Sequence, residues 1–213
     1  MHVLVIGASK GTGRALVDEL VTRGHRVRGM IRDPEQATDL AEAGAEPVHG
    51  DLEGDLDGVF EGVDAVAFCA GSGSATGADA TLRVDLHGAV RSFDACLEHG
   101  VRRYVLLSSN RAEDPLAGPE EMRHYLAAMH ARERLLWASG LDATVVRPGR
   151  LTYDAPTGRI RVGVPQIPDR GEIPRADVAA VLASCLERDD LVGAVFGVLA
   201  GEEPIEDALA SLT

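Results

Sequence analysis

The chain has 213 residues, a formal net charge of −13 and 45% apolar residues. This length and composition are typical of a globular protein with a sizeable core, and they argue against a disordered chain. The acidic charge repels phosphate backbones and anionic lipids, so we expect no nucleic-acid partner and no membrane partner.

The beginning of the chain and its cysteines indicate a compartment. The apolar start, residues 1–6, leads directly into a glycine-rich loop and not into a signal-peptide pattern. The three cysteines, Cys69, Cys96 and Cys185, are isolated within apolar stretches, which is typical of reduced core thiols. We therefore expect a cytoplasmic protein.

Extended and helical segments alternate along the chain. Strands are predicted at 2–7, 25–31, 45–51, 63–71, 102–110, 141–149 and 193–201. Helices are predicted at 14–24, 34–44, 79–99, 120–139 and 176–189. Two weakly patterned stretches, 71–79 and 149–175, are predicted loops, and the second would form a small substrate-side region.

This alternation predicts right-handed βαβ units. We expect an α/β protein with a Rossmann-like, doubly wound fold. A mainly parallel sheet would carry helices on both faces, in one domain spanning 1–213.

The first predicted strand leads through a glycine-rich loop, GASKGTG (7–13), into a helix. Glycines permit a tight turn and close approach of a ligand, and the helix N-terminus favours a pyrophosphate. The loop also matches the G-x-S-x-G nucleophile elbow of hydrolases, but residues 1–6 are too few to supply the earlier strand and loop that this elbow needs. We predict dinucleotide binding by Gly7, Ser9, Lys10, Gly11, Thr12 and Gly13.

The end of the second strand indicates the type of dinucleotide. A carboxylate at this point favours NAD, whereas an arginine accommodates the 2′-phosphate of NADP. Arg32 comes first, and Asp33 is the expected N-cap of the next helix. Arg28 and Lys10 add positive charge nearby. We favour NADP(H) over NAD(H), with a solvated Arg32 as the alternative.

The chain resembles the atypical short-chain dehydrogenase/reductase (SDR) proteins with NAD(P)H-binding domains, near the NmrA-like and biliverdin-IXβ (flavin) reductase-like members. The resemblance implies a Rossmann-like fold and a bound nicotinamide nucleotide, but it identifies no substrate. The similar segments follow the family's order over nearly the whole chain: VLVIGASKGTGRALVDEL, VRGMIRDPEQATDLAEAGAEPVHGDL, GVDAVAFCAG, GVRRYVLLSS, the tyrosine of HYLAAM, and LDATVVRPG followed by RADVAAVL.

The resemblance also implies roles for residues at the carboxyl ends of the strands. It assigns the pyrophosphate to Gly7, Gly11 and Gly13, the 2′-phosphate to Arg32, and the adenine to Asp51 and Leu52. It assigns the ribose to Ala70 and Gly71, and the nicotinamide end to Ser108, Ser109, Pro148, Gly149 and Arg150. Asp51 has an alternative as a turn cap.

The chain departs from the family at its catalytic motif. Ordinary members carry Tyr-x-x-x-Lys, whereas here Tyr125 is followed by Met129, and Lys10 is the only lysine. A phenol with a pKa near 10 is a poor base without a neighbouring cation, but it can donate a proton during carbonyl reduction. Tyr125 and Ser109 are therefore the candidate catalytic residues, with a backbone-capping hydroxyl as the alternative for Ser109. Tyr125 is also a candidate cofactor-binding residue, because it could take over the family lysine's contact with the nicotinamide ribose.

The other polar residues of this helix have structural interpretations. His130 is a weak substitute for the lysine, and His124 and His130 lack the spacing of a metal site, so no metal is expected. We expect Trp137 in the core. A solvated helix face is expected for Arg123, Arg132, Glu133 and Arg134.

The leading hypothesis is hydride transfer from NADPH to a small carbonyl, quinone or flavin-like acceptor that enters between 71–79, 110–120 and 150–172. A non-catalytic NAD(P)-binding sensor, as among NmrA-like relatives, is the alternative that Met129 favours. Nucleotide-sugar epimerase or dehydratase chemistry comes last, because it needs a competent base and a larger C-terminal region. The sequence leaves a monomer and a homodimer equally open.

Overall fold

A computed structural model describes residues 1–73 and 76–213 of the chain. The strands among them are β1 (His2–Ile6), β2 (Arg26–Ile31), β3 (Glu46–His49), β4 (Ala65–Phe68), β5 (Arg103–Leu107), β6 (Asp142–Pro148), β7 (Arg150–Thr152), β8 (Arg159–Gly163), β9 (Glu172–Pro174), β10 (Val195–Ala200) and β11 (Glu203–Pro204). A nine-stranded sheet has the order β11-β8-β10-β6-β5-β4-β1-β2-β3, and β7 pairs with β9 in a second, small sheet. From β10 to β3 the neighbouring strands are parallel, whereas β8 pairs antiparallel with both of its neighbours, β10 and β11.

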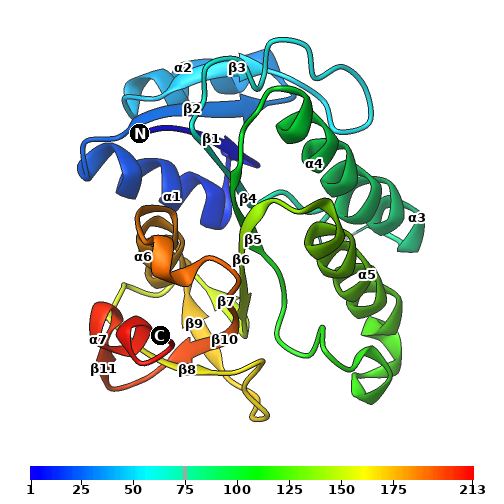
Figure 1. Cartoon of the computed structure of the whole chain (residues 1–213), viewed down its shortest axis with the longest axis vertical. Helices are drawn as coiled ribbons and strands as arrows, with labels where there is room; N and C mark the ends of the chain where they lie inside the picture. The colour runs from blue at the N-terminus through cyan, green and yellow to red at the C-terminus, as the bar shows by residue number, and fades with distance from the viewer. Residues whose placement is uncertain (74–75) are drawn as a thin grey trace.

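Helices cover both faces of the large sheet (Figure 1). They are α1 (Gly11–Thr22), α2 (Ala37–Glu42), α3 (Ala78–Ala80), α4 (Gly88–Glu98), α5 (Arg123–Ser139), α6 (Arg175–Glu187) and α7 (Ile205–Ala210). Helices α1 and α6 lie on one face, and α4 and α5 lie on the other (Figure 1). None of the helices described is long and apolar enough to cross a bilayer.

The alternation of side chains along β1 explains the two layers. Val3 and Val5 belong to the core that contains Leu16 of α1, whereas Leu4 belongs to the core that contains Phe93 of α4. Successive side chains of a strand point to opposite faces, so a continuous apolar strand needs helices on both sides. The predicted doubly wound, mainly parallel fold is confirmed.

The helix predicted over 79–99 is interrupted. A π-helical segment, Thr81–His87, separates α3 from α4. This segment buries Asp85 to 3% exposure, and the Asp85 carboxylate accepts a hydrogen bond of 3.0 Å from the backbone N–H of Ser72. Apolar spacing does not separate a π-helical turn from an α-helical one, and such turns occur frequently at functional sites.

The loop predicted over 149–175 contains β7, β8 and β9, and the strand predicted to be last is followed by β11 and α7. In β8 only Ile160 is buried, so the strand lacks the alternation that identifies a strand in sequence. Pairing with β10, for example Val162 opposite Val198, holds β8 in the sheet.

Candidate nucleotide-binding site

The glycine loop closes tightly between β1 and α1, which begins at Gly11, earlier than the predicted position 14. Gly7 has φ +88° and Gly11 has φ +61°, values that favour glycine. A Cβ on Gly13 would lie 2.1 Å from the Gly7 carbonyl oxygen. Only glycine therefore permits this close approach of helix to strand.

The N-terminus of α1 has the features of an anion site. Lys10 occupies the N-cap position without a side-chain cap, and the first turn of the helix has no acidic residue. The Thr12 hydroxyl is buried and has no hydrogen-bond partner among the residues described. Free N–H groups and a buried, unsatisfied hydroxyl fit a pyrophosphate, which would satisfy them. Ser9 is half-buried in the same loop.

Arg175, the first residue of α6, lies over this loop. Its Nε would lie 3.4 Å from a Cβ placed on Gly11. Its Nη1 donates to the Leu151 carbonyl at 2.9 Å, and its guanidinium carbon lies 4.1 Å from the centroid of the Tyr153 ring. Within the described part of the chain, no carboxylate forms a salt bridge with Arg175. Sequence reasoning missed this cation, because only the packing of α6 against α1 brings it to the loop.

The basic residues near the end of β2 are in different environments. Arg32 is exposed directly after β2, and Asp33 caps the next turn by accepting from the Glu35 N–H at 3.0 Å, as predicted. Arg28 contacts Glu46 at 2.9 Å. Cross-strand pairing with β3 thus neutralises part of the charge of this guanidinium, and its contribution near the cofactor stays a prediction.

The residues predicted to hold the adenine follow β3. The Asp51 carboxylate accepts from the backbone N–H of Glu53 at 3.0 Å, which is the turn-capping alternative. The Leu52 side chain is 5% exposed and packs close to Gly88 of α4. A contact with adenine stays a prediction for both residues.

The ends of β4 and β6 lie at the same edge of the sheet as the glycine loop. A Cβ on Gly7 would lie 2.6 Å from the Ala70 nitrogen, so the loop touches the segment that contains Ala70 and Gly71. After β6, a Cβ on Gly149 would lie 2.4 Å from the Gly171 carbonyl oxygen, so the segment after β6 packs closely against the residue that precedes β9.

Pro148 and Arg150 flank Gly149 at this edge. Pro148 is buried, whereas Arg150 is exposed and pairs with Glu172 at 2.8 Å. The cofactor roles of these residues stay predictions. The acceptor entrance predicted between 71–79, 110–120 and 150–172 lies partly outside the described residues, since 74–75 are not among them.

The solvated face predicted for α5 is wrong at two positions. Arg132 and Glu133 are each 2% exposed. Glu133 accepts a hydrogen bond from the Ser108 hydroxyl and forms an ion pair with Arg147, a buried residue of β6. The charge pattern of the helix predicts a solvated face because it does not reveal the buried partner of Glu133, which lies on a distant strand.

Tyr125, Ser109 and Met129 lie together beyond β5. Met129 is fully buried and packs in one cluster with Tyr125. The Ser109 hydroxyl donates to the Asn110 carbonyl at 3.3 Å, which is the backbone-capping alternative.

The pKa of Tyr125 is raised, first of all by burial. The charge of Arg132 lowers this pKa, Asp85 raises it, and a hydrogen bond with Ser109 lowers it. Tyr125 is therefore a neutral phenol at physiological pH, suited to donating a proton and unsuited to removing one.

His130 has a structural environment. Its Nδ1 lies 2.8 Å from the Ala112 carbonyl oxygen, and its ring lines a hollow of about 200 Å³ with Trp137 and Arg147. Trp137 also packs against the core, as predicted. Neither contact gives His130 the place of the missing lysine.

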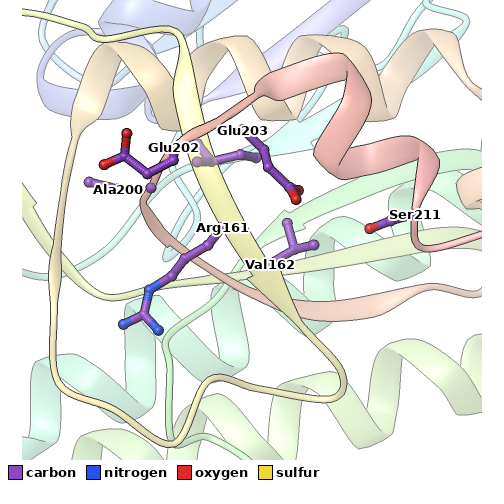
Figure 2. A pocket seen from close by; sticks show the side chains of 8 residues that line it. Arg161, Val162, Ala200, Glu202, Glu203 and Ser211 are labelled. Atoms are coloured by element: carbon purple, nitrogen blue, oxygen red, sulfur yellow. The ribbon is translucent and has the colours of Figure 1, made fainter.

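A second hollow, of about 630 Å³, lies at the far edge of the large sheet, between β8, β10, β11 and the end of α7 (Figure 2). In this view Arg161 and Glu202 point away from Ser211, so their polar groups do not converge (Figure 2). It is lined by Ile160, Arg161, Val162, Ala200, Gly201, Glu202, Glu203 and Ser211. None of the predicted site residues lines it.

Comparisons with known proteins extend over the whole chain. A family model described as NAD(P)H-binding matches residues 7–189. YhfK of Bacillus subtilis (strain 168), named an uncharacterized sugar epimerase, is 36% identical over 216 residues that cover 100% of both chains. A solved structure from Bacillus halodurans, named as an NAD-dependent epimerase/dehydratase, has a TM-score of 0.96 and 40% identity over 100% of both chains. The oxidoreductase ylbE from Lactococcus lactis has a TM-score of 0.89 and 27% identity, over 100% of this chain and 96% of that one.

Proposed function

The chain belongs to the NAD(P)H-binding family, in the epimerase/reductase group of atypical SDR proteins, and from this we propose that it binds NADP(H) and reduces a small carbonyl, quinone or flavin-like acceptor. The observation that carries the direction of the reaction is the setting of Tyr125, which packs against the fully buried Met129 where related enzymes have a lysine. Burial there raises the pKa of the phenol. A phenol that keeps its proton serves a reduction, because a reduction needs a proton donor.

The residues around the glycine loop fit the cofactor. The N–H groups at the start of α1 and the unpartnered Thr12 hydroxyl would bind the pyrophosphate, and Arg175 would neutralise part of its charge. Arg32, exposed at the end of β2, would contact the 2′-phosphate of NADP(H). When bound, the cofactor supplies the hydride.

The catalytic roles fall to two hydroxyl groups. Ser109 would orient the acceptor oxygen by a hydrogen bond, and Tyr125 would donate its proton to that oxygen as hydride reaches the acceptor carbon. The O–H bond of Tyr125 would break as the acceptor O–H bond forms, and the resulting phenolate would take a proton from water. The hydride for the new C–H bond would come from the cofactor, which is left oxidised. Quinone and flavin-like acceptors need less acid assistance than a simple carbonyl, which agrees with Met129 in place of lysine.

Two other functions remain for the test to exclude. The names of two relatives refer to epimerases, but an epimerase of this kind needs a base, and the raised pKa of Tyr125 opposes that role. A non-catalytic sensor would bind the dinucleotide without turnover, and the replacement of lysine by Met129 favours it.

The test combines a binding measurement with an activity measurement. Calorimetry with NADPH and NADH measures binding, and the absorbance of NADPH measures its oxidation with a panel of quinones, flavins and aldehydes. Tyr125→Phe should bind NADPH normally and lose turnover of the aldehydes, whereas the exposed control Tyr153→Phe should retain that turnover. Binding without turnover across the panel would overturn the reductase proposal in favour of a sensor. Interconversion of a nucleotide sugar without net NADPH oxidation would indicate an epimerase.

The proposal includes one domain over 1–213 with a substrate-side region at 149–175, in the cytoplasm. The free Cys69, Cys96 and Cys185 support that compartment. The acidic net charge supports a protein without nucleic-acid partners. Size-exclusion chromatography distinguishes the monomer from the homodimer.

A further inference from the structure

We propose that Arg132 supplies the fixed positive charge beside Tyr125 that the lysine of the Tyr-x-x-x-Lys motif supplies in related enzymes. The inference rests on the proposed function, because it assigns to one residue of this chain the electrostatic role that Met129 cannot perform. Arg132 is a positioning residue here, since it acts on the phenol and does not touch the acceptor.

Helix α5 places Arg132 on the same face as the two positions of the Tyr-x-x-x-Lys motif. Tyr125, Met129 and Arg132 follow each other at i, i+4 and i+7 along α5, the spacing of one helical stripe. The charge is therefore displaced by about one turn from the position of the motif lysine. A long side chain at 132 can cover that distance, because helical side chains lean toward the N-terminus.

The contacts of the guanidinium locate it at the strand ends. Its Nη2 donates to the carbonyl of Leu107, the last residue of β5, at 2.6 Å. Its Nη1 donates to the Asp85 carbonyl in the π-helical segment at 3.3 Å. Its central carbon lies 5.6 Å from the ring centroid of Phe68, the last residue of β4. The charge thus lies where β4, β5 and α5 meet, next to the predicted nicotinamide site.

Arg132 is a buried cation outside any salt bridge of the described residues. It is 2% exposed, yet no carboxylate of the described residues forms a salt bridge with it, and its Nε has no hydrogen-bond partner among them. Its neighbour Glu133 is engaged by Arg147. The hydrogen bonds to the Leu107 and Asp85 carbonyls and the contact with Phe68 offset part of the cost of burying this charge, and no ion pair among the described residues neutralises it.

Three groups act on the phenol electrostatically, and together they define what this charge does. They are Arg132 on the same helix, Asp85 on the π-helical segment, and Ser109 after β5. Asp85 is itself buried, and its carboxylate raises the pKa of Tyr125, whereas Arg132 lowers it. Arg132 therefore offsets Asp85 and burial, and it stabilises the phenolate that remains after proton donation.

A purely structural role of Arg132 and an electrostatic role predict different results for a lysine introduced at position 129. If Arg132 only satisfies the carbonyls of Leu107 and Asp85, a lysine at position 129 cannot replace it, because the carbonyls would stay unpaired. If Arg132 acts through its positive charge, Met129→Lys should restore the pKa of the phenol in a variant that lacks Arg132. Position 129 lies on the same helical stripe as Tyr125, so a lysine there places a positive charge near the phenol.

The experiment measures the phenol directly. Fluorotyrosine incorporated at position 125 lowers the titration range of the phenol, and fluorine NMR follows its ionisation without need for turnover. Arg132→Met should raise the pKa of this phenol by about one unit or more, and the double variant Arg132→Met/Met129→Lys should bring it back. Arg134→Met, which removes a neighbouring exposed arginine, should leave it unchanged.

Two results overturn the inference: an unchanged phenol pKa in Arg132→Met, or no recovery in the double variant. Where the methionine variant does not fold, Arg132→Gln keeps a donor toward Leu107 and carries the same expectation. Calorimetry with NADPH on the unsubstituted protein is run in parallel. Absence of nucleotide binding contradicts the proposed function, whereas normal binding with an insensitive phenol contradicts this inference alone.

Discussion

Glu133 of α5 and Arg147 of β6 form a buried ion pair in which Arg147 Nε lies 3.1 and 3.2 Å from the two carboxylate oxygens. Glu133 also accepts from the Ser108 hydroxyl, while Arg147 contacts Glu113 at 2.8 Å and donates to the Pro165 carbonyl at 3.1 Å. The pair therefore connects the end of β5 with a helix and two loops, directly behind the predicted nicotinamide site.

Breaking this pair should destabilise the protein strongly. Arg147→Met leaves the Glu133 charge buried and without its cation, a change that typically costs about 3–5 kcal/mol. Urea denaturation measures the free energy of unfolding. As a control, Arg150→Met removes the exposed pair with Glu172 and should cost less than about 1 kcal/mol. Equal losses in the two variants would contradict the importance of burial.

The close approach of Gly13 to Gly7 should make nucleotide binding sensitive to a single methyl group. Gly13→Ala places a Cβ 2.1 Å from the Gly7 carbonyl oxygen, so the loop must open and lose its anion-binding shape. We expect calorimetry to show binding of NADPH weakened by at least about tenfold, or 1.4 kcal/mol. Gly77→Ala is the matched control, because no heavy atom lies within 4 Å of its Cβ and its φ is −85°. NADPH binding that survives Gly13→Ala unchanged would rule out the loop as the pyrophosphate site.

Arg32 and Arg175 should have separable effects on the cofactor. Arg32→Ala should weaken NADPH selectively, because the 2′-phosphate is absent from NADH. Arg175→Ala should weaken both dinucleotides to a similar extent, because it lies over the loop that would hold their common pyrophosphate. A hydrogen bond to a charged group contributes about 1.5–3 kcal/mol, so each loss should be about tenfold or more in the dissociation constant. An Arg32→Ala variant that loses NADH and NADPH equally would refute the preference for NADP(H).

The buried thiols should make the fold sensitive to alkali. Burial raises the pKa of Cys96 and of Cys185 from 9.0 to about 12. The unfolded chain then releases these protons first as the pH passes 9. The stability contributed by the protonated thiols is complete below pH 9 and is lost progressively up to about pH 12.

A cysteine variant tests this linkage. Urea denaturation between pH 8 and pH 10.5 measures the slope of stability against pH, to which each fully linked thiol contributes up to about 1.4 kcal/mol per pH unit. Cys185→Ala should be less stable at every pH because of its cavity, but its slope above pH 9 should be shallower. If the plots of unfolding free energy against pH run parallel for the variant and the unsubstituted protein, the Cys185 thiol has the same pKa in the folded and the unfolded chain.

Local features of the sequence determined the fold and the location of the predicted site. The glycine loop between β1 and α1, and the alternation of apolar strands with amphipathic helices, are readable because each depends on neighbours within a few residues. The same holds for Asp33, whose capping contact with Glu35 spans two positions. The departure at Met129 is also visible in sequence, since the motif has a fixed helical spacing.

Tertiary structure alone decided which charged residues meet the site. Helical periodicity predicts that Arg132 and Glu133 lie on particular faces of α5, but it does not say that Leu107, Asp85 and Arg147 lie opposite them. Arg175 reaches Gly11 only because α6 packs against α1, although the two residues are far apart in the chain. These contacts depend on how distant elements pack, and packing is a property of the whole fold that no local pattern of residues encodes.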